Sequence, residues 1–436
     1  MKKYVLFSSL AAMPIWAHAE LTDWVKPFSD VSAGDTAWIL VSAALVLFMT
    51  LPGLALFYAG MVRKKNILGT MMQSFAVAAL VSVLWMVIGY SIAFTPNNGF
   101  FGGLERVFLN GMNVWSGEEK LTIHPNAGSL PESVFMSFQM MFAIISTAIL
   151  TGSFAERVKF SALLWFAGIW VLLVYAPTAH WVWEGGGWLA NHGVLDYAGG
   201  TVVHINAGIA GLVGALMLGK RIGYGKEAMP PANLSLTLIG AAMLWVGWMG
   251  FNAGSAVAAD ARAGMAFATT QVATAAAALT WMLCERIAHQ KPSALGWASG
   301  AVSGLVGITP AAGFVNVQGA LIIGIVTTIG CFWAVTMLKR KLGYDDTLDA
   351  FGIHGVGGII GGVLTGLLFS VSISGVEATV AHQTLIQVLG IVITVVYSGI
   401  VSFIVLKILD KTIGLRIERD DEREGLDLSQ HGERIE

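Results

Sequence analysis

Charge is scarce in this sequence: Asp, Glu, Lys and Arg together make up 12% of the 436 residues, whereas apolar residues make up 56%. A soluble chain of this length needs far more charge to cover its surface, so the composition argues against a water-soluble protein. The formal net charge of −2 gives no sign of a nucleic-acid partner. Cysteine is nearly absent, and Cys284 and Cys331 each stand inside an apolar run. They support neither a disulfide framework nor a thiolate metal site.

Long apolar runs are abundant instead, and about eleven of them are long enough to cross a bilayer. Because the bilayer core offers no water to backbone amides, these runs must be helices, which predicts an all-α membrane protein. The predicted spans are 36–60, 70–94, 131–155, 160–179, 198–219, 233–256, 264–288, 293–311, 316–337, 351–371 and 384–409.

Basic residues gather in alternate loops between these spans. One set of loops carries Arg63, Lys64, Lys65, Arg157, Lys159, Lys220, Arg221, Lys226, Arg286, Lys291, Lys339, Arg340 and Lys341. The opposite set carries only Arg106, Lys120 and Arg262. By the positive-inside rule, this asymmetry predicts an outside N-terminus and a cytoplasmic tail, 411–436, on a multi-pass protein of the inner (plasma) membrane.

The beginning of the chain has a different pattern. Two lysines precede a short apolar run, 4–15, and Ala17, His18 and Ala19 then supply small residues. The run is too short to span the hydrocarbon core, so we predict a cleaved signal peptide, 1–19. An uncleaved extra helix is the alternative. The membrane domain then covers 20–410.

Two segments of the chain resemble each other. HINAGIAGLVGALML begins at His204, HGVGGIIGGVLTGLL begins at His354, and Asp196 and Asp346 both lie eight positions before their histidine. We therefore predict two halves of five spans each. Because five is odd, the second half must be inverted, and inverted repeats place their site near the membrane midplane. The predicted divisions are about 36–219, about 233–371 and an eleventh helix at about 384–409.

Ionisable residues inside apolar spans are costly, about 2.5–3.5 kcal/mol for a charge on insertion scales. The titratable exceptions here are His204 and His354. A lone histidine in such a span is usually a packing residue, but a symmetric pair favours two imidazoles that meet in a pore. Such a pair can hold a hydrogen-bonding guest or relay a proton. A metal site is the competing interpretation, and no third ligand stands beside either histidine in sequence.

Aromatic residues supply a second candidate site. Phe138 and Phe142 stand four apart on one helical face, Trp183 ends the fourth span, and Phe251 lies in the sixth. Packing and interfacial anchoring explain such residues in most membrane proteins. A cage that binds a small cation over ring faces is the alternative. Asp196, in turn, either caps the fifth helix or binds a cation directly, and we favour the cap.

These residues together resemble the ammonium transporter family (Amt/Mep, with the Rh proteins as distant relatives). The resemblance covers nearly the whole mature chain, and several motifs follow one another in the family's order. They are Asp196 to His204, Gly250-Phe251-Asn252-Ala253-Gly254-Ser255, Thr309-Pro310-Ala311, Phe351-Gly352-Ile353-His354-Gly355 and the tail segments Gly414-Leu415-Arg416, Glu424-Gly425-Leu426-Asp427 and His431-Gly432-Glu433.

The resemblance implies a role for each matching residue. Phe142, Trp183 and Ser255 match the outer ammonium recruitment site of the family, with Phe138 beside it. Phe142 and Phe251 match its stacked phenyl gate. Trp183 favours the bacterial Amt branch, because the Rh relatives lack this tryptophan.

Deeper in the fold, His204 and His354 match the twin histidines of the family's hydrophobic pore. Asp196 matches the aspartate that supports the outer site, with Asp346 as its counterpart and Thr309 as a further supporting residue.

The family also implies assembly and partners. Its members form homotrimers in membrane lipid with one pore per subunit, and bacterial members are commonly blocked from the cytoplasm by a PII-type signal protein. Ammonium or ammonia is the implied substrate, with methylammonium as an analogue, and neither an enzymatic activity nor a cofactor is implied. Two positions depart from the family's pattern, because Glu184 and Met249 stand where glycine and phenylalanine are usual.

Selective uptake of ammonium nitrogen is the leading hypothesis. NH4+ would be captured outside and deprotonated near the gate, and NH3 would pass the two histidines while an apolar pore rejects K+. The alternative is an ammonium sensor that signals through its tail and a partner, although the tail, 411–436, encodes no output domain. A membrane enzyme is a third class, for which the sequence lacks a nucleotide loop or a nucleophile constellation.

Overall fold

The computed structural model describes residues 22–435, and the predicted signal peptide, 1–19, lies outside them. In the described part of the chain, ten helices are long and apolar enough to cross a membrane. They are Ala33–Met61 (α1, η3, α2), Lys64–Phe94 (η4, α3, η5, α4), Glu132–Phe154 (α5), Phe160–Asn191 (α6, η9, α7, α8), Gly200–Leu218 (η10, α9), Leu234–Gly254 (α10), Ala261–His289 (α11), Val317–Leu342 (α13, η11, α14), Phe351–Leu368 (η12, α15) and Val380–Thr412 (α17). The predicted helical, multi-pass architecture is confirmed.

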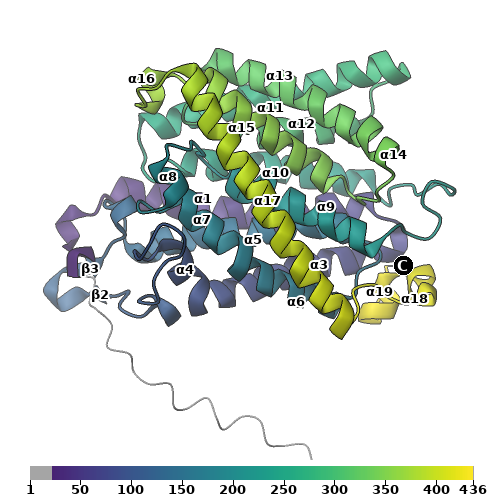
Figure 1. Cartoon of the computed structure of the whole chain (residues 1–436), viewed down its shortest axis with the longest axis horizontal. Coiled ribbons are helices and arrows are strands. Elements are labelled where there is room, and N and C mark those ends of the chain that lie inside the picture. The colour runs from purple at the N-terminus through teal and green to yellow at the C-terminus, as the bar shows by residue number, and fades with distance from the viewer. Residues whose placement is uncertain (1–21, 436) are drawn as a thin grey trace, which may run out of the picture.

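One predicted span is shorter than expected. The run 293–311 forms α12, Ala294–Ile308, which packs against α11 and α13 inside the bundle (Figure 1). Ser293 starts this helix by accepting a hydrogen bond from the amide of Gly296 at 2.8 Å. The helix ends just before Thr309 and Pro310, because a proline supplies no N–H to continue it.

The helices run between two ends of the bundle, which lie at the left and right of Figure 1. At the left end, which we call the N-terminal face, a small antiparallel sheet joins β1 (Val25–Pro27), β3 (Lys120–Thr122) and β2 (Val114–Trp115) in that order. Its register pairs Lys26 with Leu121. The right end, the C-terminal face, carries α18 (Arg419–Glu424) and α19 (Leu426–His431). This sheet is not predictable from the sequence, because strands of two or three residues leave no alternating pattern.

The two segments that begin near His204 and His354 cross each other through their glycines. A Cβ on Gly208 would lie 2.3 Å from the amide nitrogen of Gly355, and a Cβ on Gly358 would lie 3.0 Å from the carbonyl oxygen of Gly200. The two contacts are reciprocal between η10–α9 and η12–α15. Small residues allow this approach in lipid, where water gives no hydrophobic drive between helices.

We expect Gly208→Ala to destabilise the protein by about 3 kcal/mol, because the new methyl meets rigid backbone that cannot move aside. Thermal unfolding in detergent measures the effect. Gly264→Ala, in α11, is the matched control: a Cβ there meets nothing within 4 Å, so alanine should be neutral or slightly stabilising. Equal melting temperatures for the two variants would contradict the close crossing.

A network of buried charges lies at the C-terminal face. Arg221 binds both carboxylate oxygens of Asp345, with Nη2–Oδ1 and Nε–Oδ2 distances of 2.8 and 2.9 Å, and its Nη1 lies 2.8 Å from Glu156 Oε2. Glu156 also accepts from the backbone amide of Arg63 at 2.8 Å and from the side-chain amide of Asn66 at 2.8 Å. Both carboxylates are buried, so each depends on its cationic partner.

The C-terminal tail docks against this network. Arg416 donates to the backbone carbonyls of Leu218 and Lys220 at 2.8 and 2.7 Å. Farther along, Asp427 Oδ1 accepts from the amide of Gly69 at 2.7 Å, near the start of α3. The tail therefore contacts the ends of helices that lie far from it in sequence.

Candidate functional site

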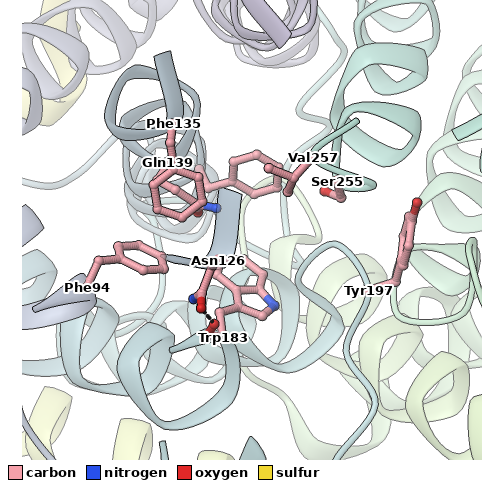
Figure 2. Close-up of a pocket in the computed structure, with 9 residues that line it drawn as sticks. Phe94, Asn126, Phe135, Gln139, Trp183, Tyr197, Ser255 and Val257 are labelled. Carbon is pink, nitrogen blue, oxygen red and sulfur yellow. Dashed lines mark hydrogen bonds between the residues drawn. The ribbon is translucent and has the colours of Figure 1, made fainter. Parts of the chain in front are cut away.

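A cavity of about 170 Å³ opens at the N-terminal face (Figure 2). Phe94, Phe135 and Gln139 line one side of it in this view, and Ser255, Val257 and Tyr197 line the other. Trp183 and Asn126 lie between them, and Phe142 completes the lining.

Hydrogen bonds fix the indole of Trp183, the last residue of α7. Its Nε1–H donates to the carbonyl oxygen of Asp196 at 2.8 Å, and its own carbonyl accepts from the side-chain amide of Asn126 at 2.9 Å (Figure 2). The ring is thus held in one orientation against the cavity, which allows it to present a fixed π surface to a guest.

Below the cavity, the predicted aromatic residues form a continuous file of rings. Phe142 meets Trp183 edge to face, with ring centroids 5.6 Å apart. It stacks on Phe251 at 4.3 Å with an interplanar angle of 29°. Phe251 stacks in turn on His204 at 6.1 Å. Both phenyl rings are buried, so they separate the cavity from the interior of the bundle.

Two of the predicted residues beside this file have different positions. Ser255 lines the cavity, and its hydroxyl donates to the carbonyl of Phe251 at 2.9 Å, which leaves the lone pairs of its oxygen free to accept. Phe138 does not line the cavity. It packs edge to face on Phe142, with centroids 4.9 Å apart, and so supports that ring from behind.

His204 and His354 meet in the interior, as the sequence pair suggests. Their Nδ1 atoms are 3.2 Å apart, and both rings are buried. They stand on two π-helical segments, η10 and η12, that begin the fifth and ninth of the ten candidate spans. Such segments widen a helix locally and often occur at functional sites.

For a neutral pair of imidazoles, the hydrogen bonds around Thr309 favour one tautomer at each ring. The Thr309 hydroxyl donates to the carbonyl of Leu305 at 2.7 Å, so toward its other neighbours it acts as an acceptor. It accepts from Trp248 Nε1 at 2.9 Å and lies 3.4 Å from His204 Nε2, which therefore carries the proton. His204 Nδ1 is then an acceptor, and His354 Nδ1–H donates to it. His354 Nε2 has no hydrogen-bond partner among residues 22–435 and remains as an acceptor.

A second, smaller cavity of about 50 Å³ lies beyond His354, on the side of the C-terminal face. Its lining includes Phe57, Tyr58, Ser299, Asp349 and His354. The imidazole pair thus separates two cavities, one toward each face of the bundle.

The two predicted supporting aspartates act on backbone amides. Asp196 accepts from the amides of Gly199, Gly200, Thr201 and Val202 at 2.5–3.1 Å, and also from the Thr201 hydroxyl. Asp346 accepts from the amides of Ala350 and Phe351 at 3.2 and 2.8 Å and from the Ser153 hydroxyl at 2.7 Å. Each carboxylate thus caps the π-helical segment that carries a histidine, and neither lines the first or the second cavity.

Several residues of the site were not predicted from the sequence: Phe94, Asn126, Phe135, Gln139, Tyr197 and Val257 in the first cavity, and Trp248 beside His204. Trp248 stacks on His204 with ring centroids 5.4 Å apart, and Gln139 lines the first cavity between Phe135 and Phe142. Both occur at helical spacing from a predicted residue, since Trp248 is three before Phe251 and Gln139 three before Phe142. That spacing was the available signal.

Comparison with known proteins gives matches along nearly the whole chain. The sequence profile described as the Ammonium Transporter Family matches residues 37–435. An ammonium transporter of Bacillus subtilis (strain 168) is 48% identical over 406 residues, which is 92% of this chain and 98% of that one. Among solved structures, Saccharomyces cerevisiae Mep2 is 36% identical with a TM-score of 0.82, covering 90% of this chain and 89% of that one. A structure titled Sensor Amt Protein is 27% identical with a TM-score of 0.84, covering 91% and 98%.

Proposed function

This chain belongs to the ammonium transporter family, and from that premise we propose that it conducts ammonium nitrogen along the file of rings between its two cavities. The proposal rests on five rings that follow one another without a break, each ring centroid within about 6 Å of the next. The rings are those of Trp183, Phe142, Phe251, His204 and His354. Ammonium transport itself agrees with the relatives named as ammonium transporters.

In the proposed mechanism, NH4+ first occupies the cavity at the N-terminal face. The faces of Trp183 and Phe142 attract the cation, a contact that contributes up to about 2 kcal/mol when it is desolvated. The hydroxyl oxygen of Ser255 accepts a hydrogen bond from one N–H group of the cation. Phe142 and Phe251 bar the bare cation, because their buried rings offer nothing to replace its water.

The cation gives its proton to solvent water at the mouth of the first cavity, and the resulting NH3 passes the phenyl pair and reaches the histidines. His354 Nε2 accepts a hydrogen bond from an N–H group of NH3. The Nδ1 atoms of His204 and His354 are 3.2 Å apart, and this direct contact offers a path along which the proton can follow. The guest is protonated again beyond the second cavity. The neutral species thus crosses the driest part of the passage.

The proposal includes a membrane arrangement. Ten candidate spans and the shorter helix α12 give eleven crossings, with the N-terminal face outside and the C-terminal face in the cytoplasm. The reciprocal glycine crossing and the two capping aspartates support two inverted halves. We further propose that the chain lies in the inner membrane, forms a homotrimer and binds a PII-type partner at the docked tail.

An ammonium sensor is the second candidate, favoured by the likeness to the structure titled Sensor Amt Protein. The part of the tail that the structure describes beyond α17 holds only the short helices α18 and α19.

Uptake by the purified protein in liposomes tests the proposal. Radiolabelled methylammonium should enter the vesicles, excess ammonium should compete with it, and K+ should not. Protein-free liposomes give the background. If the protein keeps its thermal unfolding transition but moves no methylammonium, the transport proposal fails and the sensor is favoured.

A further inference from the structure

Gln139 occupies a position in the first cavity that neither the sequence motifs nor the proposed mechanism uses. Phe135, Gln139 and Phe142 lie at positions i, i+4 and i+7 of α5, so the helix places them in one row facing the cavity. Figure 2 shows the amide of Gln139 beside Phe135, on the side of the cavity that faces Ser255 and Tyr197.

The hydrogen-bonding capacity of this side chain is not used by the protein. Gln139 is 8% exposed, and its Oε1 is buried without a partner among residues 22–435. A buried amide oxygen without a partner is costly, and a guest in the cavity that bonds to it would offset that cost. By contrast, the nearby Asn126 and Ser255 donate to carbonyl groups.

The chemistry of an amide suits a guest that changes its protonation state. NH4+ has only donors, whereas NH3 offers a lone pair as well. A half-turn of the terminal amide about its last torsion exchanges its carbonyl oxygen for its NH2 group. The same side chain can therefore accept from the cation and donate to the neutral molecule, which the ring faces of Trp183 and Phe142 cannot do.

We propose that Gln139 is a further ligand of the guest in this cavity: a half-turn of its amide brings the buried side-chain oxygen into the cavity, where it accepts a hydrogen bond from an N–H group of the ammonium cation. The proposal rests on the proposed transport function and adds a binding residue to it. Ring faces attract any small cation, and a directed acceptor adds a hydrogen bond to that attraction. Gln139 therefore raises the affinity of this cavity for the ammonium cation.

Substitutions at Gln139 in the full chain, reconstituted in liposomes, test this role. Removing one hydrogen bond to a charged donor in Gln139→Leu should raise the half-saturating concentration of methylammonium about tenfold, with little change in the maximal rate. Gln139→Glu, which keeps the shape and adds a negative charge, should lower that concentration. Gln73→Leu is the matched control, because Gln73 Oε1 is also buried without a partner in the described part of the chain, and Gln73 lines neither of the two cavities.

The outcomes separate the two proposals. If wild-type protein transports methylammonium but Gln139→Leu and Gln139→Glu keep its half-saturating concentration, the role of Gln139 is overturned and transport stands. If the wild type transports nothing, the proposed function fails first. A purely structural role would lower the melting temperature of Gln139→Leu without moving the half-saturating concentration. If Gln139→Leu does not fold, Gln139→Glu decides alone.

Discussion

In a His204→Asp, His354→Ala double variant, we expect the selectivity for ammonium over K+ to fall by tenfold or more, a change of at least about 1.4 kcal/mol in relative barrier. The substitution replaces two neutral rings by an ionised carboxylate and an empty space between the two cavities. A buried carboxylate is stable only with water or a cation beside it, so the passage fills with both. A wet passage then lets hydrated K+ follow.

The measurement compares K+ and methylammonium fluxes in liposomes and records the current at the same time. In the wild type only methylammonium should move, whereas in the double variant both ions should carry current. His192→Asp is the control, because His192 is exposed at the end of α8, away from the rings. A double variant that folds and remains as selective as the wild type would show that the imidazoles do not keep the passage dry.

Arg221→Met should destabilise the protein by about 3–5 kcal/mol, the range for removing one partner of a buried ion pair. The variant leaves the carboxylates of Glu156 and Asp345 buried with much of their compensation gone. Thermal unfolding in detergent measures this loss. Arg423→Met is the matched control, since Arg423 pairs with Asp420 on the exposed surface and should contribute less than about 1 kcal/mol. Equal effects of the two substitutions would contradict the network.

The same network predicts an acid dependence of stability. Burial alone would raise the pKa of Glu156, but the charges of Arg221 and Arg63 outweigh it and lower the pKa to about 2. The folded-state pKa is thus below the ordinary value of 4.5, so the contribution of Glu156, about 3 kcal/mol, is complete above pH 4.5. It is lost as the pH falls toward 2. The melting temperature of Arg221→Met should depend less on pH in that range.

Much of the fold follows from the sequence because membrane helices have one dominant signal. Apolar runs located the ten candidate spans, since lipid permits no other backbone arrangement for such runs. The basic loops predicted which residues gather at one face, and Arg63 and Arg221 do meet at Glu156. They did not indicate that Arg221 pairs with Asp345, because 124 residues separate the two and no local pattern connects them.

The site was predicted unevenly, for a similar reason. His204 and His354 stood out because a polar residue in an apolar run is rare and because the two halves repeat it. Gln139 is also a polar residue within an apolar run, but no equivalent residue in the other half of the chain drew attention to it. Trp248 looked like one more large apolar residue of a span. Its contact with His204 depends on how α10 packs against η10, which spacing along one helix does not determine.

The docked tail has an evolutionary consequence. Arg416, in the tail, binds the main-chain carbonyls of Leu218 and Lys220. In the opposite direction, Lys65 binds the main-chain carbonyl of Glu422, in the tail, at 2.9 Å. Carbonyl groups are present whatever the side chain. Mutational drift can therefore replace the side chains at 218 and 220 without releasing the tail, provided that the loop keeps its length. Insertions or deletions there would dislodge it.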